Sequence, residues 1–159
     1  MRLFFALWPP AATAAALHAW AGGLEGRATR SENIHLTLAF LGEADERKAA
    51  AAATRAKGRK HHLPLQRAEY WRHNRIVWVG PADTPPLLLE LVKSLHGELR
   101  AADFVLEDRP FAAHVTLLRK AKRPAAFPAL PAAEWPVGEF SLVASVHGRY
   151  RIVETFQLR

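Results

Sequence analysis

The chain has 159 residues, half of them hydrophobic, which is enough apolar material for a sizeable core. It contains no cysteine, and this excludes a disulfide framework, a thiol nucleophile and a thiolate metal site. Lys and Arg number 22 against 15 Asp and Glu, so the formal net charge is +7. A surface of that charge attracts polyanions, with nucleic acid as the first candidate.

The N-terminal segment is apolar but short. Residues 3–8 read Leu-Phe-Phe-Ala-Leu-Trp and are followed by Pro9-Pro10, which predicts a buried strand that ends at the prolines. This run is too short for a membrane-spanning helix or for the usual core of a signal peptide. We therefore expect a cytoplasmic protein that does not bind membranes.

The elements that follow are predicted from periodicity and from their Gly and Pro boundaries. Residues 11–24 are Ala-rich and predict a helix that stops near Gly22-Gly23. The rest of the chain predicts, in order, a strand at 33–41 ended by Gly42, a helix at 43–57, a basic turn at 58–62, strands at 63–70 and 75–79, a helix at 87–99, a strand at 111–118, a proline-containing loop at 120–136 and a closing pair of strands at 140–146 and 150–158.

The order apolar strand, proline, helix, alternating strand occurs twice. Its first occurrence leads to the strand that contains His35 and its second to the strand that contains His114. The sequence therefore predicts two related halves, each of the α+β class.

The two alternating strands carry the same short motif, His-x-Thr between aliphatic residues. It appears as His35 and Thr37 in the first half and as His114 and Thr116 in the second. Residues two apart in a strand point to the same face, so each half presents an imidazole beside a hydroxyl. One such triplet also fits a half-buried histidine bonded to a nearby hydroxyl, but two copies in equivalent places favour a shared site.

This residue set suits phosphodiester chemistry. Histidine has an ordinary pKa near 6.5, so one imidazole can accept a proton while the other donates one. The hydroxyls of Thr37 and Thr116 can donate to phosphate oxygens, and Arg119 or Lys120 can neutralise their charge. Such a site can open or close a phosphodiester without a metal, and we expect neither a metal nor another cofactor.

The paired motifs, in the contexts "NIHLTLAFLGE" and "FAAHVTLLR", closely resemble the 2H phosphoesterase superfamily. Within it, the sequence is similar to the RNA 2′,3′-cyclic phosphodiesterases, also called 2′-5′ RNA ligases. The resemblance spans nearly the whole chain, including the "RLFFALWPP" opening and the strand at 150–158. One position departs from the family: Ala113 stands where a proline often precedes the histidine.

The resemblance implies a fold and a set of roles. The fold is a single domain over residues 1–159, α+β and bilobal, whose two interleaved, pseudosymmetric lobes have antiparallel-rich sheets facing a central cleft and helices on the outside. The implied catalytic residues are His35 and His114, and the residues implied to bind the substrate phosphate are Thr37, Thr116 and Arg119.

The activity implied is hydrolysis of RNA 2′,3′-cyclic phosphate ends to 2′-phosphates, and we expect the protein to be a monomer. In that scheme His114 activates water and His35 protonates the departing 3′-oxygen, or the two roles are reversed. Two alternatives remain open. One is a related phosphodiesterase that acts on small cyclic nucleotides or 2′-5′ linkages, including reversible ligation. The other is a non-catalytic RNA-binding protein.

Strand geometry leaves two positions undecided. Arg119 lies five residues after His114, so strict alternation aims it away from the histidine, and it reaches the phosphate only if the strand ends or twists near Leu118. Lys120 has the correct parity and competes for the role. Phe40 occupies the same place after His35, as a core aromatic or as a base-stacking RNA contact.

Three further groups have weaker signals. His61, His62 and His73 suggest a metal site or, more simply, solvated basic turns, and they come without spaced carboxylates. Trp71 and Trp78 are candidates for base stacking or for the core. The cations Arg59, Lys60, Arg72 and Arg75 fit either an RNA backbone or solvent.

Overall fold

A computed structural model describes residues 2–159. These residues form three α-helices, one short 3-10 helix and ten strands. The helices are α1 (Ala11–Ala21), η1 (Ser31–Asn33), α2 (Glu46–Thr54) and α3 (Pro86–Ala101). The strands are β1 (Arg2–Leu7), β2 (Arg27–Ala28), β3 (Leu36–Glu43), β4 (His61–His62), β5 (Arg67–Trp71), β6 (Ile76–Gly80), β7 (Val115–Arg119), β8 (Pro136–Val137), β9 (Glu139–Val146) and β10 (Arg149–Gln157).

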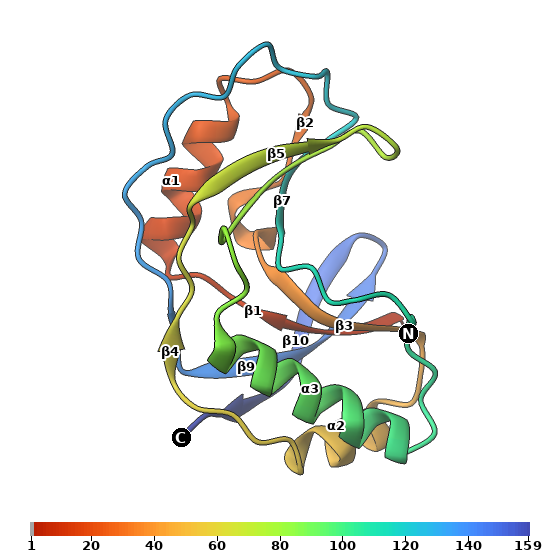
Figure 1. Cartoon of the computed structure of the whole chain (residues 1–159). Coiled ribbons are helices and arrows are strands. Elements are labelled where there is room, and N and C mark those ends of the chain that lie inside the picture. The colour runs from red at the N-terminus through yellow and green to blue at the C-terminus, as the bar shows by residue number, and fades with distance from the viewer. Residues whose placement is uncertain (1) are drawn as a thin grey trace.

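The strands build two antiparallel four-stranded sheets, which confirms the expected α+β class with antiparallel-rich sheets. The first sheet has the order β10-β9-β1-β3 and the second has the order β2-β7-β6-β5 (Figure 1). The two motif strands occupy equivalent positions, because β3 pairs with β1 in one sheet and β7 pairs with β6 in the other. A small third sheet pairs β4 with β8.

The helices cross from one sheet to the other. Helix α1 follows β1 of the first sheet but contacts β7 of the second, whereas α3 follows β6 of the second sheet but contacts β3 of the first (Figure 1). Each sheet is therefore contacted by a helix that follows a strand of the other sheet. The two halves are interleaved along the chain for this reason.

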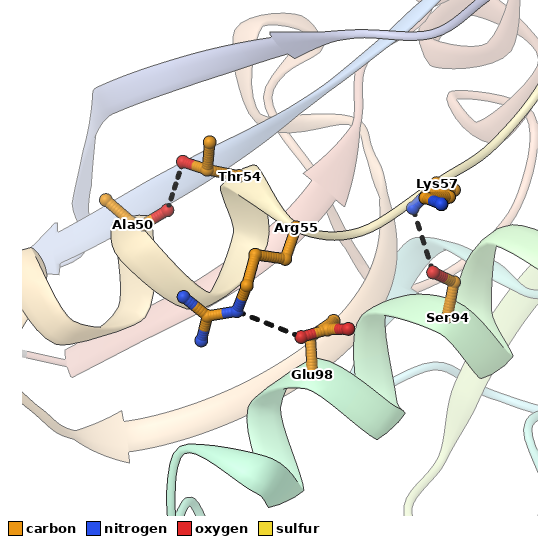
Figure 2. A network of polar contacts seen from close by, with 6 residues as sticks. All are labelled: Ala50, Thr54, Arg55, Lys57, Ser94 and Glu98. Carbon is orange, nitrogen blue, oxygen red and sulfur yellow. Dashed lines mark hydrogen bonds and ion pairs between the residues drawn. The ribbon is translucent and has the colours of Figure 1, made fainter.

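Helices α2 and α3 lie side by side against the first sheet and are joined by polar contacts (Figure 2). Arg55 at the end of α2 donates from Nε to Glu98 Oε2 at 3.1 Å, and the Lys57 amide donates to Ser94 Oγ at 2.8 Å. Leu88, Leu91 and Leu95 hold the other side of α3 in the core. These contacts fix α3 beside the first motif strand.

Strand β1 divides its side chains between the main core and the opposite face of its sheet. Leu3, Phe5 and Leu7 are buried in the main core. Phe4 and Ala6 form a separate small cluster on the other face. Both faces of the sheet are therefore apolar at its centre, and burying one Leu or Phe side chain there contributes about 1.5–3 kcal/mol.

Several boundaries differ from the sequence predictions. Strand β3 begins at Leu36 rather than at residue 33, because residues 31–33 close a 3-10 turn. It also continues through Gly42, whose φ of +69° lets the strand bend instead of ending it. The expected basic turn at residues 58–62 contains β4, since His61 and His62 pair with β8.

Candidate active site

The first motif strand contains an extra residue at its centre. In the pairing of β1 with β3, Phe5 lies opposite Ala39 and Ala6 lies opposite Thr37, so Leu38 has no counterpart on β1. This β-bulge reverses the side-chain alternation that follows it.

The second motif strand has the same irregularity at the equivalent position. Trp78 of β6 lies opposite Thr116 and Val77 lies opposite Leu118, which leaves Leu117 unmatched. The burial pattern agrees, because Leu117 and Leu118 are both buried and Arg119 is exposed. The bulge turns Arg119 to the face of Thr116 without ending the strand, so the departure from strict alternation that Arg119 requires is present at Leu117.

The two motifs meet at one cavity of about 280 Å³, and all five predicted catalytic and phosphate-binding residues line it. They are His35, Thr37, His114, Thr116 and Arg119. Six residues that the motifs did not indicate complete the lining: Arg27, Ala28, Thr29, Arg30, Asn33 and Tyr150.

Backbone carbonyls hold both imidazoles in the same tautomer. Because a carbonyl only accepts, Nδ1 of His35 donates to the Asn33 oxygen at 2.7 Å and Nδ1 of His114 donates to the Ala112 oxygen at 2.8 Å. This leaves Nε2 of each ring as the atom that can exchange a proton. Nε2 of His35 lies 3.1 Å from Thr37 Oγ1, whose hydroxyl donates to it when the ring is neutral.

Aromatic side chains surround both imidazoles. The ring centroid of His35 lies 5.0 Å from that of Phe4, 5.4 Å from Trp8 and 5.5 Å from Tyr150. The ring of His114 lies 4.7 Å from Trp71 and 6.2 Å from Trp78. Each half therefore holds its histidine against an apolar wall.

This burial changes the acid–base properties of both histidines. Burial is the largest cause that lowers the pKa of His35, and the charges of Arg119 and His114 lower it further, against a raising effect of the Asn33 carbonyl. Burial likewise lowers the pKa of His114, with Arg119 as a further cause and the Ala112 carbonyl opposing it. Both imidazoles therefore lose their proton more readily than an exposed histidine does.

The lining is strongly positive. Arg27 and Arg30 add two guanidinium groups to that of Arg119, and none of the described lining residues is acidic. In β2, Arg27 is paired directly with Arg119 of β7, and such close cations are stabilised by an anion bound between them. Arg30 also forms an exposed ion pair with Glu32 at 3.1 Å.

Sequence reasoning missed Arg27 and Arg30 although a signal was present. They belong to a basic segment that ends at Arg30, five residues before His35, with Thr29 between them. Tyr150 gave no local signal, since 115 positions along the chain separate it from His35 and only the pairing of β10 into the first sheet brings it there.

A larger cavity, about 590 Å³, adjoins the site on the His114 side. Its walls include Trp71, Trp78 and Phe111, together with Arg67, Glu69 and Asp83. Trp71 thus contacts His114 and also borders the second cavity. Trp78 of the larger cavity is paired with Thr116 of the smaller one, so these two side chains share a face of the second sheet.

The remaining candidates lie outside the smaller cavity. Phe40 is 48% exposed and has the Arg2 guanidinium 5.3 Å from its ring centroid. Lys120 lies just beyond β7 with a φ of +49° and is exposed. Neither residue lines the cavity that contains the two motifs.

The other histidines and cations are engaged separately. Within residues 2–159 there is no cluster of three or more His, Cys, Asp or Glu that could hold a metal ion. His61 donates from Nδ1 to the Arg59 carbonyl at 2.8 Å, and His73 lies against Trp71 at 5.9 Å. Arg59 pairs with Glu90 at 2.8 Å. None of the described helices has the length and apolar character that crossing a bilayer requires.

Comparison with known proteins agrees with this fold. A family model described as LigT like Phosphoesterase matches residues 7–78. The RNA 2′,3′-cyclic phosphodiesterase of Escherichia coli K12 is 35% identical, and the match covers 94% of this chain and 90% of that protein. The RNA 2′,3′-cyclic phosphodiesterase of Thermus thermophilus is 30% identical, with 100% and 91% covered.

A solved structure is also similar over its full length. The crystal structure of E. coli LigT complexed with 3′-AMP has a TM-score of 0.90 and 32% identity, covering 99% of this chain and 97% of that one. Fold and sequence together define a LigT-like phosphoesterase of the 2H superfamily. Within that class, the chain belongs to the RNA 2′,3′-cyclic phosphodiesterase family.

Proposed function

We propose that this protein hydrolyses RNA ends that carry a 2′,3′-cyclic phosphate, leaving a 2′-phosphate, and that it uses two imidazoles rather than a metal. The observation that carries the proposal is the pair of equivalent histidines in one cavity, each held through Nδ1 and each with Nε2 available for proton transfer. The relatives in E. coli and T. thermophilus, both RNA 2′,3′-cyclic phosphodiesterases, support the substrate class.

The chemical step needs one proton removed and one supplied. His114 takes a proton from water, the water oxygen bonds to phosphorus, the bond from phosphorus to the 3′-oxygen breaks, and His35 protonates that oxygen. The reversed assignment fits the same geometry, because both imidazoles are held alike. Protonation of the acid is favoured once a phosphate anion is bound, since an adjacent negative charge raises a histidine pKa.

The phosphate is held by hydroxyl and guanidinium groups. Thr37 and Thr116 donate hydrogen bonds to its non-bridging oxygens, and Arg119 both donates and neutralises charge. Arg27 and Arg30 add to the attraction for a polyanion. The aromatic walls of the larger cavity offer a surface on which a base of the RNA can stack beside His114.

The test is an assay of one oligonucleotide with three different ends: a 2′,3′-cyclic phosphate, a linear 3′-phosphate and a 3′-hydroxyl. We expect turnover of the cyclic end alone, with the product phosphate on the 2′-oxygen and with full activity in EDTA, since the two imidazoles supply both proton transfers. Tight binding without turnover would instead support an RNA-binding protein. Loss in EDTA that one divalent metal reverses would overturn the metal-independent mechanism.

A further inference from the structure

The residues that are bulged directly after the two motif threonines, Leu38 and Leu117, have carbonyl groups that accept hydrogen bonds from outside their own strand. The Leu117 oxygen accepts from the Thr29 amide at 2.8 Å. The Leu38 oxygen accepts from Nε2 of His96 at 2.8 Å. The two halves therefore fix the same point of the motif with different donors.

The position of each strand in its sheet explains the difference. Strand β7 has β2 on its far side, and the Thr29 amide continues that ladder. Strand β3 is the edge strand of its sheet, so no described strand supplies an amide there. A side chain of α3 takes that place, and the edge carbonyl is satisfied by an imidazole.

The helix that carries His96 is itself well anchored. Two residues that flank His96 in the sequence contact the segment at the end of α2 (Figure 2). Ser94 accepts a hydrogen bond from the Lys57 amide, and Glu98 accepts one from the Arg55 side chain. Leu95 is fully buried in the core. The position of the His96 imidazole relative to the Leu38 carbonyl of β3 is therefore fixed by the packing of α3.

We propose that His96 is a positioning residue for the first motif, an inference that rests on the proposed function. By holding the carbonyl of Leu38, it fixes the bulge directly after Thr37. Thr37 directly precedes Leu38, so a shift of the Leu38 carbonyl displaces the backbone that carries the Thr37 hydroxyl, which contacts Nε2 of His35. His96 thus acts on the phosphate-binding hydroxyl and on one of the proton-transfer groups without touching the substrate.

The proposal predicts a specific pattern of activity. His96→Leu removes the donor and retains an apolar side chain, and it should lower kcat about tenfold while KM changes less than about threefold, because small displacements of a reacting group are costly. His96→Gln keeps an amide donor of similar reach and should restore most of the loss. His62→Gln, on an exposed histidine of β4, is the matched control and should leave kcat unchanged.

A double-mutant cycle separates positioning from general destabilisation. If His96 acts through Thr37, then His96→Leu should have little further effect on kcat in a Thr37→Val protein. In a Thr116→Val protein it should retain its full effect, since Thr116 belongs to the other half. Equal losses in both backgrounds, or an unchanged kcat in His96→Leu, would overturn the proposal.

A second readout does not depend on turnover. In protein labelled with 15N-histidine, His96→Leu should move the Nε2 resonance of His35 towards its value in Thr37→Val and leave that of His114 in place. Unmoved His35 signals would contradict the inference even if the enzyme proved inactive on cyclic phosphates. Conversely, the expected shift in a protein without turnover would overturn only the proposed function. If His96→Leu does not fold, His96→Ala serves in both experiments.

Discussion

At the scale of single residues, the charge of Arg119 has two effects. It attracts a bound phosphate, and it lowers the pKa of both imidazoles. In the free protein it is one cause of the lowered pKa of His35 and of His114. When a phosphate occupies the cavity, the same guanidinium is neutralised by the anion. Binding of substrate is therefore expected to raise both histidine pKa values from their lowered starting point.

The pH dependence of kcat/KM should reflect these free-enzyme values. The histidine that acts as base becomes protonated as the pH falls through its pKa, and the one that acts as acid loses its proton as the pH rises through its own. The profile of kcat/KM against pH is therefore bell-shaped. Because both pKa values lie below 6.5, the bell should lie on the acid side of neutrality rather than around it. Initial rates at low substrate from pH 4 to 9 measure this profile.

Arg119→Gln removes one cause of the lowering, so both limbs of the bell should move to higher pH. Limbs that stay in place in this variant would contradict the electrostatic role of Arg119. A wild-type profile with both limbs above pH 7 would contradict the burial effect on the two imidazoles.

Arg119 and its neighbour Lys120 give a matched pair of substitutions. Arg119→Ala should lower turnover by about tenfold to a thousandfold, the scale for loss of one group that stabilises developing charge. Lys120→Ala should mainly weaken RNA capture and its salt dependence, because Lys120 is exposed outside the cavity. Steady-state kinetics at two salt concentrations separates the effects. If Arg119→Ala had nearly normal turnover and Lys120→Ala had strongly reduced turnover, Lys120 rather than Arg119 would be the residue that stabilises the phosphate charge.

At the scale of elements, the motif strands show what the sequence could and could not predict. Alternation correctly put each histidine and threonine on one face, but it aimed Arg119 the wrong way. The sign of the bulge was present in the paired apolar residues Leu117-Leu118 and, in the other half, Leu38-Ala39. Two apolar neighbours also fit a strand end, so a bulge is distinguished only by the pairing with β6 and β1.

Close packing of β6 against the segment before β7 leads to a prediction about Gly80. A Cβ at Gly80 would lie 2.7 Å from the carbonyl oxygen of Ala113, directly before His114, and 3.2 Å from the Trp78 ring. Gly80→Ala should therefore destabilise the protein by about 1–3 kcal/mol and lower kcat by displacing His114. Thermal denaturation and kinetics measure both effects.

Gly97→Ala is the control for this substitution. It adds a methyl group in helix α3 where nothing lies within 4 Å, and it should be neutral or stabilising by up to about 1 kcal/mol. If Gly80→Ala behaved like Gly97→Ala in both stability and kcat, the tight approach at Ala113 would not be needed to hold His114.

At the scale of the whole molecule, the repeated order of elements predicted two related halves, and the sheets confirm it. The exchange of α1 and α3 between the halves was not predictable, because each helix has an apolar face that fits either sheet and only tertiary packing selects one. The site residues that lie within or next to a motif were therefore predicted. Arg27, Arg30 and Tyr150 were missed, because they belong to other segments of the chain. The single-domain organisation over residues 1–159 stays a prediction, and Met1 lies outside the described residues.

The most direct test of the central claim is the single-turnover rate for opening a 2′,3′-cyclic phosphate by His35→Ala and by His114→Ala. Each imidazole supplies a separate proton transfer, so each substitution should lower the rate at least about a hundredfold while the protein remains folded by circular dichroism. His62→Ala, on an exposed histidine outside the cavity, should keep the wild-type rate. A near-normal rate in either of the first two variants would contradict the mechanism with two histidines.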